Sequence, residues 1–176
     1  MKKRVFSLSV AIASLMTAPG AVLANDFVVG QSSNLNVTLN TNVQWIVVRQ
    51  ATVVIPGGDA AAHGCVATAS ADMGIGAAAL GAENQYLFVL ARNNPNPLLN
   101  TGSERLLELV NNGGGVNDPD SKPVATTQHF TNLTNWNGAG GGGSHTFYLL
   151  GRKVLAAHVD ADVLDASLSV MCVDTP

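Results

Sequence analysis

The chain is poor in charge, in aromatic side chains and in cysteine. Charged residues make up 12% of its 176 positions, aromatic residues make up 5%, and there are two cysteines. Beyond the N-terminal residues, no stretch has more than two adjacent basic side chains, as at Arg152-Lys153. Nucleic acids and anionic lipids are bound through clusters of Lys and Arg. The composition therefore argues against a nucleic-acid partner and against attachment to an anionic membrane surface.

Several signatures of catalysis are also missing. The sequence has no C-x-x-C pair, no G-x-S-x-G motif, and no glycine-rich loop followed by Lys and Ser or Thr. Four histidines are present, but His129 and His145 each stand alone within a predicted strand or at its edge. A nucleophile needs a contacting base and an orienting acid, and no local pattern supplies them. We therefore expect no enzymatic activity and no cofactor, with a hydrolase as the less favoured alternative.

The first 24 residues have the layout of a cleaved bacterial export signal. A basic patch at 2–4 precedes an apolar run at 5–16, and Val22 and Ala24 stand at the −3 and −1 positions of a cleavage site. The apolar run is too short to span a bilayer, and no later segment is long enough. We expect residues 1–24 to be removed, leaving residues 25–176 as one domain in the periplasm or outside the cell. Because the leader holds three of the nine Lys and Arg and none of the twelve Asp and Glu, the mature net charge is −6.

The two cysteines, Cys65 and Cys172, both lie in the predicted mature chain. An isolated pair in an oxidising compartment is most simply a disulfide, because no spacing typical of a metal or redox site is present. Such a bond would close a loop of about 100 residues and stabilise the fold by up to about 5 kcal/mol in the chain-entropy model. Each cysteine also falls on the apolar face of a predicted strand. The sequence therefore predicts a buried structural disulfide.

Apolar and polar residues alternate with a period of two along most of the chain, which is typical of half-buried β-strands. Glycine, proline and asparagine clusters separate the alternating segments. The alternation in the second segment is interrupted at Arg49-Gln50. The predicted strands cover residues 34–40, 43–55, 65–71, 85–92, 124–130, 145–150 and 165–172.

The segment 103–112 fits two interpretations. As a helix, it would be capped by Ser103 and would direct Leu106, Leu109 and Val110 inward; as a strand, it would place alternate residues on one face. We favour a strand, because its neighbours are strands. About eight or nine short strands then predict an all-β, antiparallel two-sheet sandwich of jelly-roll or Greek-key type with little helix.

Three segments resemble the late strands of secreted bacterial jelly-roll domains similar to the tumour-necrosis-factor fold. They cover residues 129–133, 144–150 and 165–170, in the last third of the mature chain. The resemblance lies in the pattern of strands and transfers no ligand or catalytic residue. It implies a domain that forms trimers and serves as a structural or binding module.

Two groups of residues are candidates for ligand binding. Asn135, Trp136 and Asn137 form a loop whose ring and amide groups suit a glycan or a peptide, although Trp136 would equally well anchor the loop. The second group is acidic and precedes the last strand, where it would offer oxygen ligands to calcium or form a plain solvated turn. It lacks the glycine and glutamate of the calcium-loop consensus. Its members are Asp160, Asp162 and Asp165.

The many small, uncharged residues favour close packing between copies of the chain. We therefore expect an exported, non-enzymatic structural module that associates with itself as a trimer or polymer. Glycan or peptide binding through the loops is the alternative, and calcium binding is less favoured.

Overall fold

The computed structural model describes residues 27–33, 37–55, 62–75, 81–97, 103–110, 121–130 and 143–175. The predicted export signal at 1–24 lies outside these residues and stays a prediction. The described residues form strands and connecting turns and contain no helix, so no described segment is a helix capable of crossing a membrane. The nine strands are β1 (Phe27–Ser33), β2 (Val37–Leu39), β3 (Ile46–Ile55), β4 (Ala62–Ile75), β5 (Glu83–Arg92), β6 (Arg105–Val110), β7 (Ser121–Phe130), β8 (Gly143–Lys153) and β9 (Ala161–Thr175).

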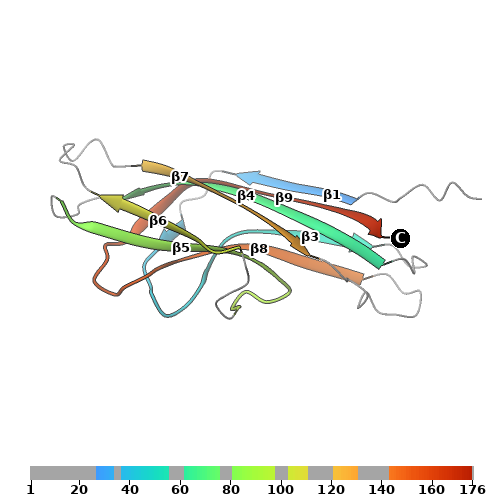
Figure 1. Ribbon diagram of the computed structural model, residues 1–176, viewed down its shortest axis with the longest axis horizontal. Coiled ribbons are helices and arrows are strands. Elements are labelled where there is room, and N and C mark those ends of the chain that lie inside the picture. The colour runs from blue at the N-terminus through green and yellow to red at the C-terminus, as the bar shows by residue number, and fades with distance from the viewer. Residues whose placement is uncertain are drawn as a thin grey trace, which may run out of the picture.

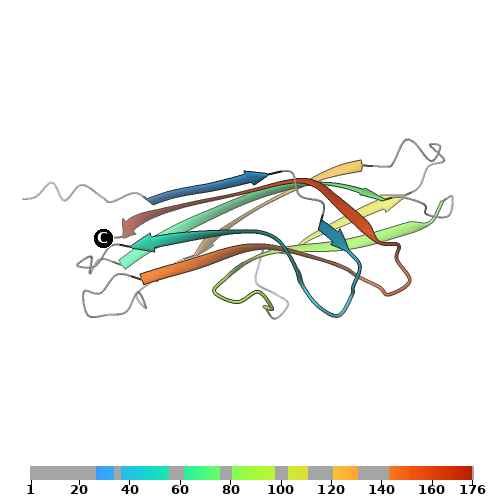
Figure 2. The same cartoon turned by 180° about the vertical axis from the view of Figure 1, so that it is seen from behind.

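The strands form two antiparallel sheets that pack face to face, as Figures 1 and 2 show from opposite sides. The first sheet has the order β1-β9-β4-β7, and β2 also pairs with β9. Because β4 runs along one side of β9, β1 and β2 share its other side in succession. The second sheet has the order β3-β8-β5-β6. This arrangement confirms the predicted all-β, two-sheet sandwich.

The strand pairs are nested along the chain. The strands β1 and β2 pair with β9, β3 pairs with β8, β4 pairs with β7, and β5 pairs with β6. The first half of the chain therefore forms one long antiparallel ribbon with the second half, and this ribbon wraps over itself. Where the ribbon wraps over itself, β4 also pairs with β9 and β5 also pairs with β8, and these contacts complete the two sheets. Such wrapping is the topology of a jelly roll.

The core forms where small side chains of the first sheet meet large side chains of the second. Strand β4 directs alanines inward, whereas β5 and β8 direct aromatic and aliphatic side chains inward. Large and small residues on facing layers interdigitate, which lets the sheets approach closely. The alanines are Ala67, Ala69 and Ala71, and the large residues include Tyr86, Phe88, Leu90, Phe147 and Leu149.

One glycine of β8 lies where its neighbours approach closely. A methyl group at Gly151 would lie 3.1 Å from both terminal methyls of Leu39 and from the ring of Phe88. A side chain at this position would therefore require Leu39 and Phe88 to shift by a few tenths of an ångström.

The two cysteines are direct neighbours on adjacent strands. Cys65 of β4 and Cys172 of β9 are register partners, their Cα atoms lie 4.0 Å apart, and they form a disulfide. Both side chains are buried in the core. The prediction of a buried structural bond is therefore confirmed.

Most predicted strands are present, but their limits differ. The ambiguous segment 103–112 contains β6, so the favoured strand interpretation is confirmed and the helix is wrong. The strands β4 and β9 extend well beyond the predicted 65–71 and 165–172, because the two pair along nearly their whole lengths. The predicted strand at 34–40 is reduced to β2 in the described residues. Strand β1 was not predicted at all.

The irregularity expected near Arg49 is a change of register in β3. The pairing with β8 shifts between Val47 and Arg49, which turns the Arg49 side chain inward, where it is 4% exposed. Its Nε donates to the Ala166 carbonyl of β9 at 3.0 Å, and its Nη1 donates to the Val48 carbonyl at 2.9 Å. This guanidinium therefore links the two sheets through backbone oxygens.

Candidate functional site

The predicted ligand loop of Asn135, Trp136 and Asn137 lies outside the described residues. Its role in glycan or peptide binding stays a prediction.

The three aspartates proposed for calcium have separate surroundings. Asp160 accepts a 2.7 Å bond from the Lys153 ammonium, and Asp162 accepts one of 2.7 Å from the Thr38 hydroxyl. Asp165 lies instead on the outer surface of the first sheet. No group of three or more His, Cys, Asp or Glu in the described part of the chain is arranged to hold a metal ion.

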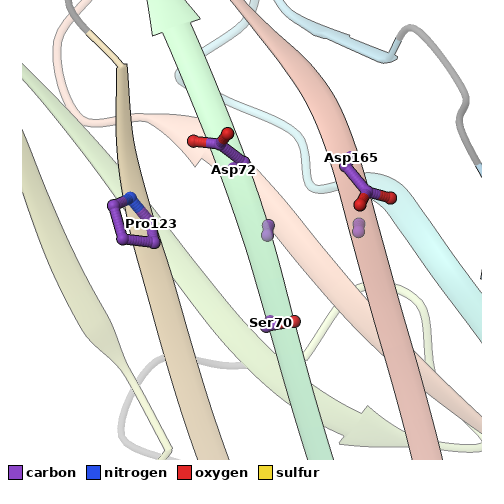
Figure 3. Close-up of a pocket in the computed structure, with 6 residues that line it drawn as sticks. Ser70, Asp72, Pro123 and Asp165 are labelled. Atoms are coloured by element: carbon purple, nitrogen blue, oxygen red, sulfur yellow. The ribbon is translucent and has the colours of Figure 1, made fainter.

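A depression of about 290 Å³ lies on the outer surface of the first sheet, across β7, β4 and β9 (Figure 3). Asp72 and Asp165 are register partners there, next to Pro123. Figure 3 shows that their carboxylates point away from each other, which separates two like charges. The nearby Ser70 hydroxyl forms a 2.7 Å hydrogen bond with that of Ser167. The depression thus holds two diverging carboxylates and an engaged hydroxyl, an arrangement that does not form a catalytic pair.

Beyond the depression, the same surface carries rows of small hydroxyl side chains, here called the hydroxyl face. The register places Thr127, Thr68 and Ser169 in one row across β7, β4 and β9. The hydroxyls of Thr68 and Thr127 lie 3.4 Å apart. The next row combines Ala125, Ser70 and Ser167. These two rows contain no charged side chain.

The hydroxyl face ends at β7, the outer strand of the first sheet, which pairs with β4 among the described strands. The first residues of this strand include its only Lys and its only Pro, at 122 and 123. The remaining seven residues, 124–130, contain no Asp, Glu, Lys, Arg, Pro or Gly. This run therefore lacks the charges and prolines that often protect the outer strand of a sheet.

A polar cluster occupies one end of the sandwich, where β5 ends and β8 begins. His145 is 6% exposed, and its Nδ1 lies 2.8 Å from Nδ2 of Asn93. Oδ1 of Asn93 accepts a 2.9 Å bond from the Thr146 amide, so its Nδ2 is the donor toward His145. Asn93 has a φ of +54°, a left-handed conformation that asparagine tolerates better than most residues. The cluster therefore favours a neutral imidazole that accepts a hydrogen bond at Nδ1.

Stability is expected to fall as the pH decreases through the titration range of His145. Burial, and secondly the positive charge of Arg92, lower the pKa of His145 below its ordinary value of 6.5. The unfolded chain therefore binds this proton at a higher pH than the folded chain does. The contribution of neutral His145 to stability is complete above the pKa that this residue has in the unfolded chain. It is lost as the pH falls toward the lower pKa that His145 has in the folded chain.

Urea unfolding at about pH 7.5 and about pH 5.5 tests this linkage, because the two values bracket the ordinary histidine pKa. Wild type should lose more stability between them than His145→Gln, whose amide still accepts a bond from Asn93. Equal losses in the two proteins would contradict the prediction.

A second polar group holds the β8–β9 connection at the opposite end of β5. Nδ1 of His158 lies 3.1 Å from the Gln85 amide nitrogen and 3.3 Å from that of Leu155. The Tyr86 hydroxyl donates to the Val159 carbonyl at 2.8 Å, and burial, with the charge of Asp160, raises the pKa of Tyr86. These contacts fix backbone and provide no nucleophile with a base. His129 is exposed on β7, and the structure does not describe the side chain of His63.

Two connecting segments meet over the outer surface of the second sheet. Trp45, which precedes β3, donates from Nε1 to the Pro97 carbonyl at 3.2 Å. The Arg152 guanidinium stacks on the Trp45 ring at 4.8 Å from its centroid. The segment before β3 is thereby tied to the segment after β5. Beneath them lies a small buried cluster of Val89, Ala91 and Leu150, with Tyr148 packed beside it.

Sequence reasoning missed the surface features that the strand register creates. Asp72 becomes a neighbour of Asp165, and Thr68 becomes a neighbour of Thr127, only because β4 lies between β7 and β9. The one signal available was the charge-free alternation of residues 124–130, which predicted a strand but not an edge.

No family model matches this chain, and neither does any curated protein. Among solved structures, dimeric latent PorU from Porphyromonas gingivalis is similar with a TM-score of 0.43 and 12% identity, over 86% of this chain and 13% of that chain. The VP2 subviral particle of infectious bursal disease virus has a TM-score of 0.26 and 10% identity, over 97% of this chain and 47% of that chain. The chain thus spans less than half the length of either neighbour. The resemblance to tumour-necrosis-factor-like domains stays a prediction, and function is inferred from this chain's own residues.

Proposed function

We propose that this protein is an exported, non-enzymatic structural module whose copies associate with one another. The observation that supports this most directly is the hydroxyl face, whose small, uncharged side chains continue onto the outer strand β7. Charged residues are depleted from the centres of protein interfaces because burying them costs free energy. Burying the uncharged hydroxyl face in an interface would therefore cost little free energy.

The disulfide supports the export part of the proposal. Bonds of this kind persist in oxidising compartments and are rare in the cytosol. The buried bond between Cys65 and Cys172 is therefore compatible with a periplasmic or extracellular location. The bacterial type of the leader supports the same location.

Self-association is tested by measuring the mass of the purified protein under non-reducing conditions. Size-exclusion chromatography with light scattering, over a concentration series, should show a dimer, a closed trimer or a polymer. A monomer at every concentration would overturn the proposal. A monomer that also bound glycans on an array, or hydrolysed a chromogenic substrate, would instead favour a loop-mediated binding module or an enzyme.

A further inference from the structure

The two sheets of the sandwich differ in how far their outer surfaces are covered. On the second sheet, the members of the small cluster beneath Trp45 are at most 5% exposed. On the first sheet, the threonines of the hydroxyl face, Thr68 and Thr127, are exposed, and Met171 beside them is 48% exposed. The first sheet therefore presents a broad outer surface that the rest of the chain does not cover.

The two ends of this surface have opposite shapes. Beyond one hydroxyl row lies the depression, where three register partners on β4, β9 and β7 form what is here called the hollow end: Asp72, Asp165 and Pro123. Beyond the other row, the same three strands align three side chains, here called the protruding end: Val66, Met171 and His129. Met171 and His129 are large and exposed. Both ends lie the same number of residues from the middle of the hydroxyl face, between its two rows.

From this arrangement we infer that two copies of the chain stack through the outer surfaces of their first sheets as a two-fold dimer. The inference rests on the proposed self-association and names the surface that carries it. A two-fold axis that crosses the strands between the hydroxyl rows lays each strand over its own copy, in the opposite direction. The hollow end of one chain then lies over the protruding end of its partner. The same patch serves both subunits, as an isologous interface requires.

The charges on this surface select the crossing axis over the other two-fold stacking. An axis parallel to the strands would lay each row over the same row of the partner. The carboxylates of Asp72 and Asp165 would then meet their own copies, and such like-charge contacts are unfavourable. With the crossing axis, these carboxylates meet the protruding end, whose three side chains include no acid. The His129 imidazole can then donate a hydrogen bond to Asp72 of the partner subunit.

The size of the surface suits a stable dimer. At about 3.3 Å per residue along a strand and about 4.8 Å between strands, the outer surface of β1, β9, β4 and β7 covers roughly 700 Å². Each partner contributes about 800 Å² to a typical stable interface. The small side chains of the hydroxyl face also allow two sheets to approach to the usual separation of about 10 Å.

A charge reversal tests the contact between His129 and Asp72. Within one chain their rows are six residues apart along β4, or about 20 Å, so salt largely screens any direct interaction between them. His129→Asp would set a carboxylate beside Asp72 of the partner subunit, and we expect the dimer dissociation constant to rise by about tenfold or more. Adding Asp72→Lys should return it to within about threefold of wild type, because opposite charges then meet across the interface.

Thr52→Asp is the matched control. Thr52 is an exposed residue of β3 on the outer surface of the second sheet, and its hydroxyl lies 3.1 Å from that of Thr146. The variant introduces the same charge at an exposed strand position outside the proposed interface, so it should associate like wild type. Sedimentation equilibrium at one salt concentration measures the dissociation constants of wild type and the three variants. Recovery in the double variant would also show that His129→Asp does not act by unfolding the chain.

The outcomes separate the two proposals. A monomeric wild type would overturn the self-association itself. A wild type that associates would leave that function standing, but three results would overturn the stacking of first sheets. These are a closed trimer, a dissociation constant that His129→Asp leaves unchanged, and a double variant that associates as weakly as His129→Asp alone.

Discussion

Replacing Cys65 and Cys172 together by alanine is expected to lower the free energy of unfolding by about 2–5 kcal/mol. The bond joins residues 107 positions apart, so its loss frees a long loop in the unfolded chain. At about 2–4 °C per kcal/mol for a chain of this size, the melting temperature should fall by several degrees at least. Denaturant unfolding monitored by circular dichroism measures the change.

The reduced wild type is the control for this variant. It loses the same crosslink but keeps both sulfur atoms in the core, so the difference between the two proteins reports the small cavity left by alanine. If the double variant stayed within about 0.5 kcal/mol of the oxidised wild type, the disulfide would not be a main source of stability.

Phe147→Ala is the second substitution with a large expected effect, a loss of about 3–5 kcal/mol. The ring is fully buried between the sheets and meets the ring of Phe130 edge to face, with centroids 5.2 Å apart. Alanine would leave a cavity that the surrounding strands can fill only in part. Equilibrium urea unfolding of the variant and wild type measures the loss.

Three further variants make this result specific. Tyr148→Ala changes the next residue of β8, which faces the outer surface and is only half-buried, and it should cost clearly less. Phe130→Ala, alone and combined with Phe147→Ala, completes a double-mutant cycle, in which the coupling of the rings should be about 0.5–1.5 kcal/mol. Equal losses for Phe147→Ala and Tyr148→Ala would contradict the assignment of Phe147 to the core.

The strands were largely predictable because alternation is a local property. Successive side chains of a strand point to opposite faces, so Phe88 of β5 points inward and its neighbours in sequence point outward. This alternation can be recognised without knowing which strand pairs with β5. The same reasoning placed Cys65 and Cys172 on buried faces and favoured a strand at 103–112. It failed at β1, where no alternation was recognised. The strand is completed by pairing with β9.

The surface features were not predictable, because each depends on residues distant in sequence. The inward turn of Arg49 requires an acceptor on β9, more than one hundred residues away. The neutral state favoured at His145 depends on Asn93 and Arg92 from another strand. The acidic residues expected to act together were separated by their partners, because Lys153 and Thr38 each contact one of them.

The amino-acid sequence alone therefore determined the class of fold, the presence of the central strands and the chemistry of the single covalent crosslink. These follow from the polarity of neighbouring residues and from the presence of one cysteine pair. Only the tertiary structure decided that β7 is an outer strand, that small hydroxyl side chains gather on the outer surface of the first sheet, and that the carboxylates of Asp72 and Asp165 point away from each other. Strand order depends on which long-range pairs bury the most apolar surface, and that is a property of the whole chain.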